Sequence, residues 1–196
     1  QPEGIALGRQ LVWVANIRDG TVNRIDRASP AVVGAPIGVG GKPTGVFVGS
    51  SVWVTNNADA TVTRIDPSTA QVVGAPIAVG RQPRGVIEGA GSVWVANSGD
   101  DTVSRLDPQT GRRLGAPIKV GRNPRELTVG LGFVWVANND DNSVTRIDPR
   151  TGKVVGTAIP VGKDPLGIAA GSDSVWVVNH GDDSVSHSAS VLACRA

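Results

Sequence analysis

Few side chains in this sequence could carry out acid–base or nucleophilic chemistry. The sequence contains two histidines, His180 and His187, no tyrosine and one cysteine, Cys194. A catalytic serine, histidine and aspartate must be held together by partners, and no motif marks such a set although serines are plentiful. A single cysteine cannot form an internal disulfide or a thiolate metal site. We therefore expect a non-enzymatic protein with no cofactor and no bound metal.

Charged side chains that recur at a fixed spacing are the better candidates for a site. Each of five aspartates follows an asparagine by three residues, and basic residues lie within two residues of a repeated proline. Such a mixture can bind a polar ligand, whereas the alternative for the aspartates is to cap turns through hydrogen bonds to the backbone. The candidate ligand-binding residues are Asp19, Lys42, Asp59, Arg81, Arg84, Asp100, Arg122, Arg125, Asp141, Lys163 and Asp182.

The composition indicates an all-β protein. The 196 residues include 26 glycines and 13 prolines, whereas glutamate occurs only as Glu3, Glu88 and Glu126. Glycine and proline serve turns, and glutamate favours helices. The net charge of +2 and the scattered basic residues do not indicate a nucleic-acid partner. Apolar runs are short, so we expect no insertion into a membrane.

A repeat of 40 to 41 residues covers the whole chain. Each copy contains a near-copy of Val-Trp-Val-Ala-Asn, then Thr-Val or Ser-Val, and four copies continue with Arg-Ile-Asp or Arg-Leu-Asp. The five tryptophans are Trp13, Trp53, Trp94, Trp135 and Trp176. This periodicity predicts a β-propeller of five four-stranded antiparallel blades of about 41 residues. The predicted blades of this single domain, 1–196, cover about 1–40, 41–80, 81–121, 122–162 and 163–196.

Turn signals divide each copy into four strands. In the second copy they predict strands A to D over 45–48, 52–56, 61–66 and 71–79. Asp-Pro-x-Thr-Gly between strands C and D predicts a hairpin with glycine at positive φ, as at Gly111 and Gly152. Flanking valines predict that the tryptophans lie in the core between blades. Arg24, Arg64, Arg105 and Arg146 are predicted to stack on a tryptophan or pair with the aspartate two residues later.

The repeated unit resembles the YVTN family of β-propeller repeats, which is similar to NHL repeats and to the streptogramin lyases. The resemblance rests on the motifs Pro-x-Gly-Val, Val-Trp-Val-Ala-Asn and Thr-Val-x-Arg-Ile-Asp-Pro-x-Thr-Gly. Trp occupies the position where the family usually has Tyr. The resemblance implies a propeller and leaves a streptogramin-lyase-like C–O lyase as an alternative function. That activity would use His, Glu and magnesium, and no matching His and Glu positions occur in the sequence.

The fifth copy departs from the repeat. It has His187-Ser188-Ala189 in place of Arg-Ile-Asp, and its outer strand shrinks to about 190–193. We expect a closed five-bladed ring with a divergent last blade. The alternatives are a fragment of a larger propeller sensor domain, or an incomplete ring that an oligomer completes.

Strand order predicts which loops share a face. Because successive strands reverse direction, the B to C turns and the D to A connections emerge at the same end, and they carry all the candidate ligand-binding residues. We expect a binding or scaffold module that recognises a glycan, peptide or protein through this loop face. Similar repeats occur in secreted bacterial proteins, which favours an extracellular or cell-envelope location.

Overall fold

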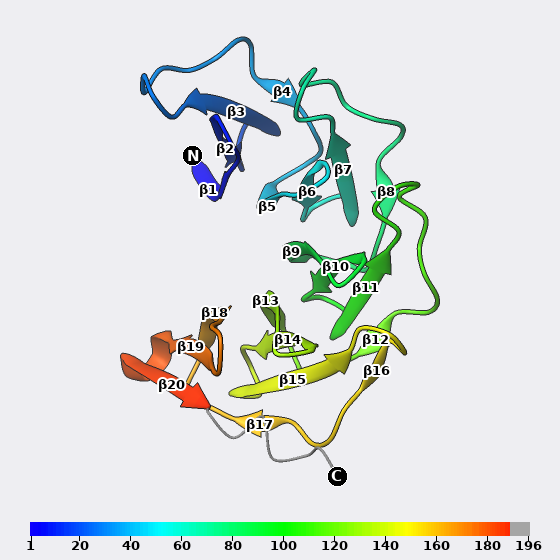
Figure 1. The fold of residues 1–196 in the computed structure, drawn as a ribbon, viewed down its shortest axis with the longest axis vertical. Coiled ribbons are helices and arrows are strands. Elements are labelled where there is room, and N and C mark those ends of the chain that lie inside the picture. Colours follow the sequence, from blue (N-terminus) through cyan, green and yellow to red (C-terminus); the bar gives the residue numbers. More distant parts are fainter. Residues whose placement is uncertain (189–196) are drawn as a thin grey trace.

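The computed structural model describes residues 1–188 as five consecutive antiparallel sheets arranged in an arc (Figure 1). Each sheet is one blade, and its strands follow one another from the inner edge of the arc to the outer edge. The predicted all-β propeller fold is confirmed. None of the described helices is long and apolar enough to cross a membrane.

The blades repeat the same order of strands. Blade 1 contains β1 (Pro2–Leu7), β2 (Leu11–Asn16), β3 (Thr21–Asp26) and β4 (Ile37–Gly38). Blade 2 contains β5 (Pro43–Val48), β6 (Val52–Asn56), β7 (Thr61–Ile65) and β8 (Ile77–Ala78). Blade 3 contains β9 (Pro83–Gly89), β10 (Ser92–Asn97), β11 (Thr102–Leu106) and β12 (Ile118–Lys119).

The last two blades vary this pattern at their outer edges. Blade 4 contains β13 (Pro124–Gly130), β14 (Phe133–Asn138), β15 (Ser143–Asp148), β16 (Lys153–Val154) and β17 (Ile159–Pro160). Blade 5 contains β18 (Pro165–Ala170), β19 (Val175–Asn179), the 3₁₀ turn η1 (His180–Asp182) and β20 (Ser184–Ser188). The outer strand predicted over 190–193 lies outside the described residues.

The outer strand of a blade is broken, which corrects the prediction of a continuous strand over 71–79. In blade 2 only a bridge between Ile65 and Val72 and the short strand β8 remain. Between them Gly74 has φ +73°, and Pro76 has no N–H to donate to a strand ladder. The hairpin turn before it was predicted correctly, because Gly111 and Gly152 have φ values of +72° and +68°.

The core lies between blades and follows the alternation of the second strand. Trp53, which is fully buried, packs with Val93 and Val95 of blade 3, whereas Val52 and Val54 on its other side pack with Trp13 of blade 1. The same arrangement recurs between blades 3 and 4 and between blades 4 and 5. The prediction of a tryptophan core is therefore confirmed for the first four tryptophans.

The repeated arginines stack on these tryptophans. The guanidinium carbon lies 5.4 Å from the ring centre of Trp53 for Arg64 and 5.0 Å from that of Trp94 for Arg105. Arg105 also donates from Nε to Ser92 at 2.8 Å, which fixes the plane of the guanidinium. Stacking, rather than the predicted alternative of a pair with the following aspartate, is what the structure shows for these two arginines.

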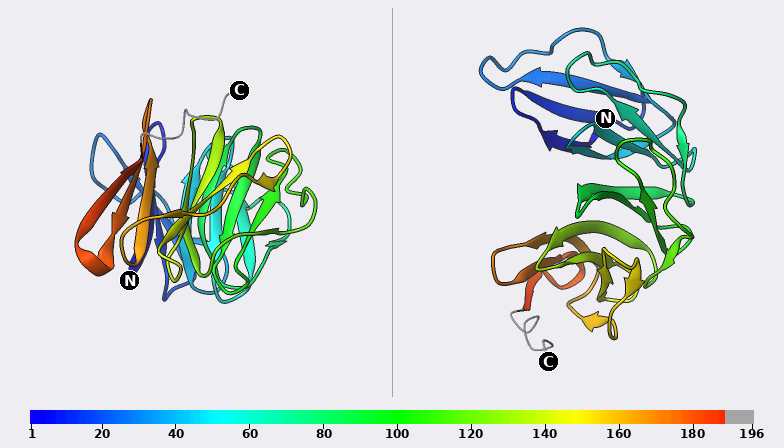
Figure 2. Two further views of the ribbon diagram at one scale, coloured as in Figure 1. Left: turned by 90° about the horizontal axis from the view of Figure 1, so that it is seen from below. Right: turned by 45° about the vertical axis from the view of Figure 1, so that its right-hand side comes forward.

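The predicted closure of a five-bladed ring is wrong for the described residues. The arc is open between blade 1 and blade 5 (Figures 1 and 2). The fifth tryptophan, Trp176, is 48% exposed, and Ile5 in β1 is 68% exposed. Five blades of this curvature span only part of a circle, so the first and last blades do not meet.

Candidate functional site

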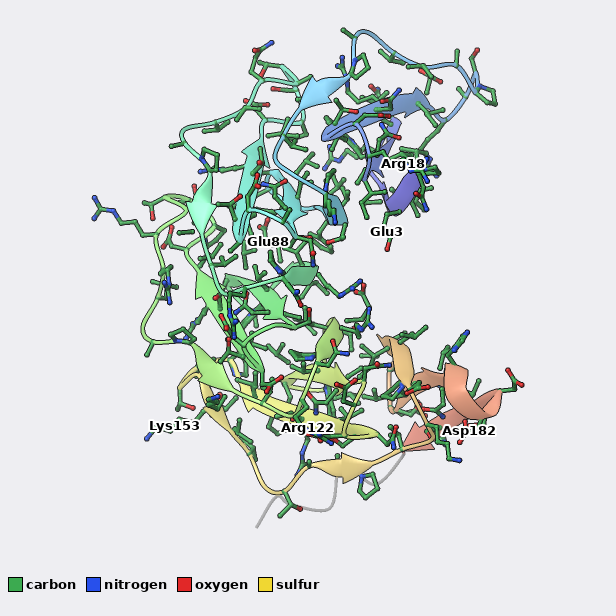
Figure 3. All side chains as sticks on the ribbon, turned by 180° about the vertical axis from the view of Figure 1, so that it is seen from behind. Glu3, Arg18, Glu88, Arg122, Lys153 and Asp182 are labelled. Carbon is green, nitrogen blue, oxygen red and sulfur yellow. The ribbon has the colours of Figure 1, made fainter. Side chains whose placement is uncertain are left out.

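The inner strands of all five blades line a cavity of about 410 Å³ on the concave side of the arc. Its lining residues are Glu3, Gly4, Ile5, Thr44, Gly45, Val46, Arg84, Val86, Arg125, Glu126 and Leu166. Four of these side chains are charged, and Figure 3 shows one of them, Glu3, at the inner edge of the arc. We refer to this cavity as the central pocket.

The residue after the repeated proline reaches the pocket because each inner strand bulges there. In blade 3 the pairing of β9 with β10 is regular from Gly89 to Val86 and then shifts before Pro83. A bulge leaves a residue unpaired and re-aims its side chain. Arg84 lies in this bulge, and the equivalent bulge of β13 contains Arg125. The same position is occupied in the other blades by Glu3, Thr44 and Leu166.

The next position in the bulge shows why Glu126 is unusual. It is glycine in the other four copies, and a Cβ added at Gly85 would lie only 2.6 Å from the Arg125 carbonyl oxygen of blade 4. From blade 1 to blade 4, adjacent inner strands are thus too close for a side chain at this position, since a Cβ added at Gly4 or Gly45 would also meet the backbone of the next blade. In blade 4 this glycine is replaced by Glu126, which extends the carboxylate into the pocket.

Two arginines of the pocket each have one side-chain nitrogen without a hydrogen-bonding partner. The Nε atoms of Arg84 and Arg125 are covered by protein, and neither has a hydrogen-bond acceptor. Burial lowers the pKa of Arg84, and the positive charge of Arg125 lowers it further, whereas Glu3 and Glu126 act in the opposite direction. None of these four charged residues forms an ion pair in the part of the chain that the structure describes.

Glu126 is the titratable group most affected by the pocket. The protein around it removes water and raises its pKa to about 7, while the charge of Arg84 partly opposes this rise. Its side chain is nevertheless open to the cavity, so water still solvates the carboxylate from one side. Glu126 therefore changes its charge near neutral pH at a place that a ligand can reach.

The aspartates of the loop face bind the connections between blades. Asp100 accepts hydrogen bonds from the backbone N–H and the Nε of Arg81, at 2.7 and 2.6 Å. Asp141 does the same for Arg122, at 2.6 Å for both bonds. These hydrogen bonds lower the pKa of both aspartates, and the bond from the backbone N–H has the larger effect in each case. Each such pair holds a B to C turn against the D to A connection before the same blade.

The remaining loop-face candidates are arranged similarly. Asp59 accepts from the backbone N–H of Gly41 at 2.6 Å, and Asp182 accepts from the backbone N–H of Lys163 at 3.0 Å. Asp19, Lys42 and Asp59 border one shallow depression between blades 1 and 2. The structure thus spreads the loop-face candidates around the arc in small local groups. Arg84 and Arg125 were predicted in the D to A connections, but they lie in the inner strands β9 and β13, and both line the central pocket.

The repeated asparagine at the end of the second strand is a structural residue. Asn97 is fully buried, donates from Nδ2 to Thr102 at 3.0 Å and Ser104 at 2.9 Å, and accepts from the Gly80 N–H at 3.1 Å. These bonds join the second strand to the third strand and to the preceding connection. They hold the B to C turn and the preceding D to A connection in place.

Replacing Asn97 with alanine is expected to lower the free energy of unfolding by about 2–3 kcal/mol, because it leaves buried polar groups without partners. Asn57→Ala is the control, since the Asn57 side chain makes one hydrogen bond within residues 1–188, from Nδ2 to the Pro83 carbonyl at 3.2 Å. Urea unfolding of both variants measures the difference. Equal destabilisation would show that the buried network has no special weight.

Among the charged residues of the pocket, sequence reasoning missed Glu3 and Glu126. A signal was available, because glutamate occurs only three times and Glu126 replaces a repeated glycine. The third glutamate, Glu88, accepts a hydrogen bond from Nε1 of Trp53 at 2.9 Å. Neither His180 nor His187 lines the pocket. The described residues contain no group of three or more His, Cys, Asp or Glu that could hold a metal ion.

Comparisons with known proteins show the fold of this chain. Neither the family models nor the curated proteins match its sequence. The hydrazine synthase of Kuenenia stuttgartiensis matches its structure with a TM-score of 0.81 and 19% identity, over 90% of this chain and 55% of that chain. A streptogramin B lyase matches with a TM-score of 0.76 and 19% identity, over 95% of this chain and 68% of that chain.

A third solved structure comes from a protein complex. A chain of a nidogen/laminin complex matches with a TM-score of 0.75 and 13% identity, over 95% of this chain and 74% of that chain. This chain therefore spans from about half to three quarters of the length of the three solved chains. At these identities the likeness shows a β-propeller and leaves the ligand to be argued from the site.

Proposed function

We propose that this protein is a non-enzymatic binding module that takes up an anionic group of a polar ligand between Arg84 and Arg125. The observation that carries the proposal is the pair of guanidinium groups with covered, unpartnered Nε atoms in one cavity. Arginine binds carboxylates and phosphates through several parallel hydrogen bonds. An anion placed between the two arginines would be attracted by both positive charges and would reduce the repulsion between them.

The other charges of the pocket narrow the class of ligand. Glu3 and Glu126 place carboxylates in the same cavity, so a ligand with both an anionic group and donor groups fits better than a simple anion. Peptides and acidic glycans have this combination. The resemblance to YVTN and NHL repeats, and the propeller neighbour in a nidogen/laminin complex, support a peptide, protein or glycan as the partner.

A titration screen tests this proposal. Isothermal titration calorimetry would compare N-acetyl-glutamate amide, a glucuronate disaccharide and N-acetyl-phosphotyrosine amide with their uncharged counterparts N-acetyl-glutamine amide, a glucose disaccharide and N-acetyl-tyrosine amide. We expect measurable binding for at least one anionic compound, and weaker or no binding for its uncharged partner. Equal binding of the members of every pair would contradict recognition of an anion.

A lyase is the second candidate function, and Glu126 is the observation that favours it. A carboxyl group with a pKa near 7 can accept a proton at neutral pH, and several of the solved propellers with this fold are lyases. Incubation with virginiamycin B, followed by mass spectrometry, tests for cleavage. Loss of any activity in Glu126→Gln would assign the base, whereas an unchanged substrate would remove this candidate.

We also propose that the protein acts outside the cell or in the cell envelope. The support is the resemblance to repeats of secreted bacterial proteins. Cell fractionation with an antibody against the chain tests this location, and recovery in the cytosolic fraction would contradict it.

A further inference from the structure

The two ends of the arc expose the same kinds of surface that pack together inside it. At the blade 5 end, Trp176 is 48% exposed, Val178 53% and Val185 59%. The equivalent residues of blade 2 are Trp53, Thr55 and Val62, all fully buried against blade 3 or its loops. Among the described residues, Trp176 stacks on His187, with ring centres 4.3 Å apart, at the position where blades 2 to 4 carry the stacking arginine. We call this surface the tryptophan face.

The blade 1 end carries the complementary surface. Ile5 and Leu7 in β1 are 68% and 67% exposed. Their equivalents in blade 2, Val46 and Val48, pack against the cluster that contains Trp13. Ile5 and Leu7 pair with Val14 and Val12 of β2, so the four side chains belong to one apolar sheet face. We call this surface the valine face.

Each internal interface joins one tryptophan face to one valine face. Between blades 1 and 2, Trp13 and Val22 contact Val52, Val54 and Ile65. Between blades 3 and 4, Trp94 and Val103 contact Val134, Val136 and Ile147. The free faces thus continue an interface that the protein already uses four times, and each has the chemistry to receive one more blade.

Two of the solved neighbours contain more polypeptide than the part that matches this chain. This chain covers 68% of one streptogramin B lyase chain and 69% of a virginiamycin B lyase chain. The remaining third of those chains corresponds to about two blades of the present repeat. The opening therefore has room for about two blades, whereas a second copy of this chain has five. A second copy cannot close the arc without a change of curvature.

We propose that about two further blades of the same repeat, from polypeptide outside residues 1–196, fill the opening between blade 5 and blade 1. One would place its valine face on Trp176, and the other would place its tryptophan face on Ile5 and Leu7. The inner strands of these blades would also complete the wall of the central pocket. This inference rests on blade packing and is independent of the ligand proposed above.

An extended protein tests the proposal. A second copy of residues 81–162, followed by one glycine, is fused before Gln1 so that its prolines stay in phase with Pro2. Acrylamide quenching of Trp176 is obtained as the difference between each protein and its Trp176→Phe variant. We expect Trp176 to be accessible in the 196-residue chain and protected several-fold in the extended protein.

The double variant Ile5→Asp, Leu7→Asp supplies the second measurement. In the 196-residue chain both side chains are exposed, so the thermal midpoint should change by about 2 °C or less. In the extended protein it should fall by about 5–10 °C, because the aspartates would enter an apolar interface. Equal shifts in both proteins, or an unprotected Trp176 in the extended protein, would overturn the proposal.

Sedimentation velocity of the 196-residue chain separates this proposal from self-association. We expect a monomer at micromolar concentration. A stable dimer in which Trp176 is protected from acrylamide would mean that a second copy covers the free faces, and it would also overturn the proposal.

Discussion

Replacing Trp94 with alanine is expected to lower the free energy of unfolding by about 3–5 kcal/mol. Trp94 is fully buried between blades 3 and 4, where it packs against Val134 and Val136. Its Nε1 donates to the Gly89 carbonyl at 3.1 Å, and Arg105 stacks on its ring. Truncation would leave a cavity at an interface and remove the surface on which the arginine is held. Urea unfolding followed by circular dichroism measures the loss.

The matched control is Trp176→Ala in blade 5. This tryptophan has the same sequence context, but half of it is exposed and no following blade covers it. We expect a loss of about 1 kcal/mol or less. Equal losses for the two variants would mean that the free end of the arc is packed as tightly as its interior, which contradicts the open arrangement.

The affinity for an anion in the central pocket is expected to fall by about 5- to 30-fold as the pH rises from 6 to 8. Below its pKa of about 7 the Glu126 carboxyl is neutral, and above it the carboxylate repels an anion held by Arg84 and Arg125. Two charges separated by several ångströms in a partly solvated site interact by about 1–2 kcal/mol, which gives this range. Calorimetry across this pH interval measures the change.

The control for this pH dependence is Glu126→Gln, in which the pocket keeps its shape but loses the titrating group. The variant should bind the anion at pH 8 about as well as the native protein does at pH 6. The raised pKa also makes folded Glu126 hold its proton more tightly than the unfolded chain does. Stability should therefore decrease as the pH rises from about 4.5 through 7, and less so in the variant. If Glu126→Gln kept the native pH dependence of anion affinity and of stability, another group would be responsible for it.

The fold could be predicted from the sequence because its main signal is periodic. Trp53 and the valines on either side of it recur in every copy, so one blade predicts the others. The broken outer strand was harder to predict, because Gln71 to Val79 reads as one apolar run while Gly74 and Pro76 interrupt its pairing. Closure was predicted wrongly because it depends on the angle between blades. That angle is set by packing and cannot be predicted from residue types.

The central pocket was only partly predictable for a related reason. Arg84 and Arg125 were recognised as candidates because they adjoin a repeated proline, but their approach to one another depends on the bulge in each inner strand. Arg81 and Arg122 look equivalent in the sequence, yet each is paired with an aspartate of its own blade. Glu126 could be recognised as a candidate only from the structure, which shows why the equivalent position in other blades is glycine.

The most direct test of the central claim is a comparison of two double variants that remove the same charge. Arg84→Gln with Arg125→Gln removes the unpartnered guanidinium groups, whereas Arg81→Gln with Arg122→Gln removes the paired ones on the loop face. Calorimetric titration with the tightest anionic compound from the screen should show at least about a 100-fold loss of affinity for the first pair, because each charged hydrogen-bonding group contributes about 1.5–3 kcal/mol. The second pair should bind like the native protein. Unchanged binding in the first pair, or an equal loss in both, would contradict the central pocket as the binding site.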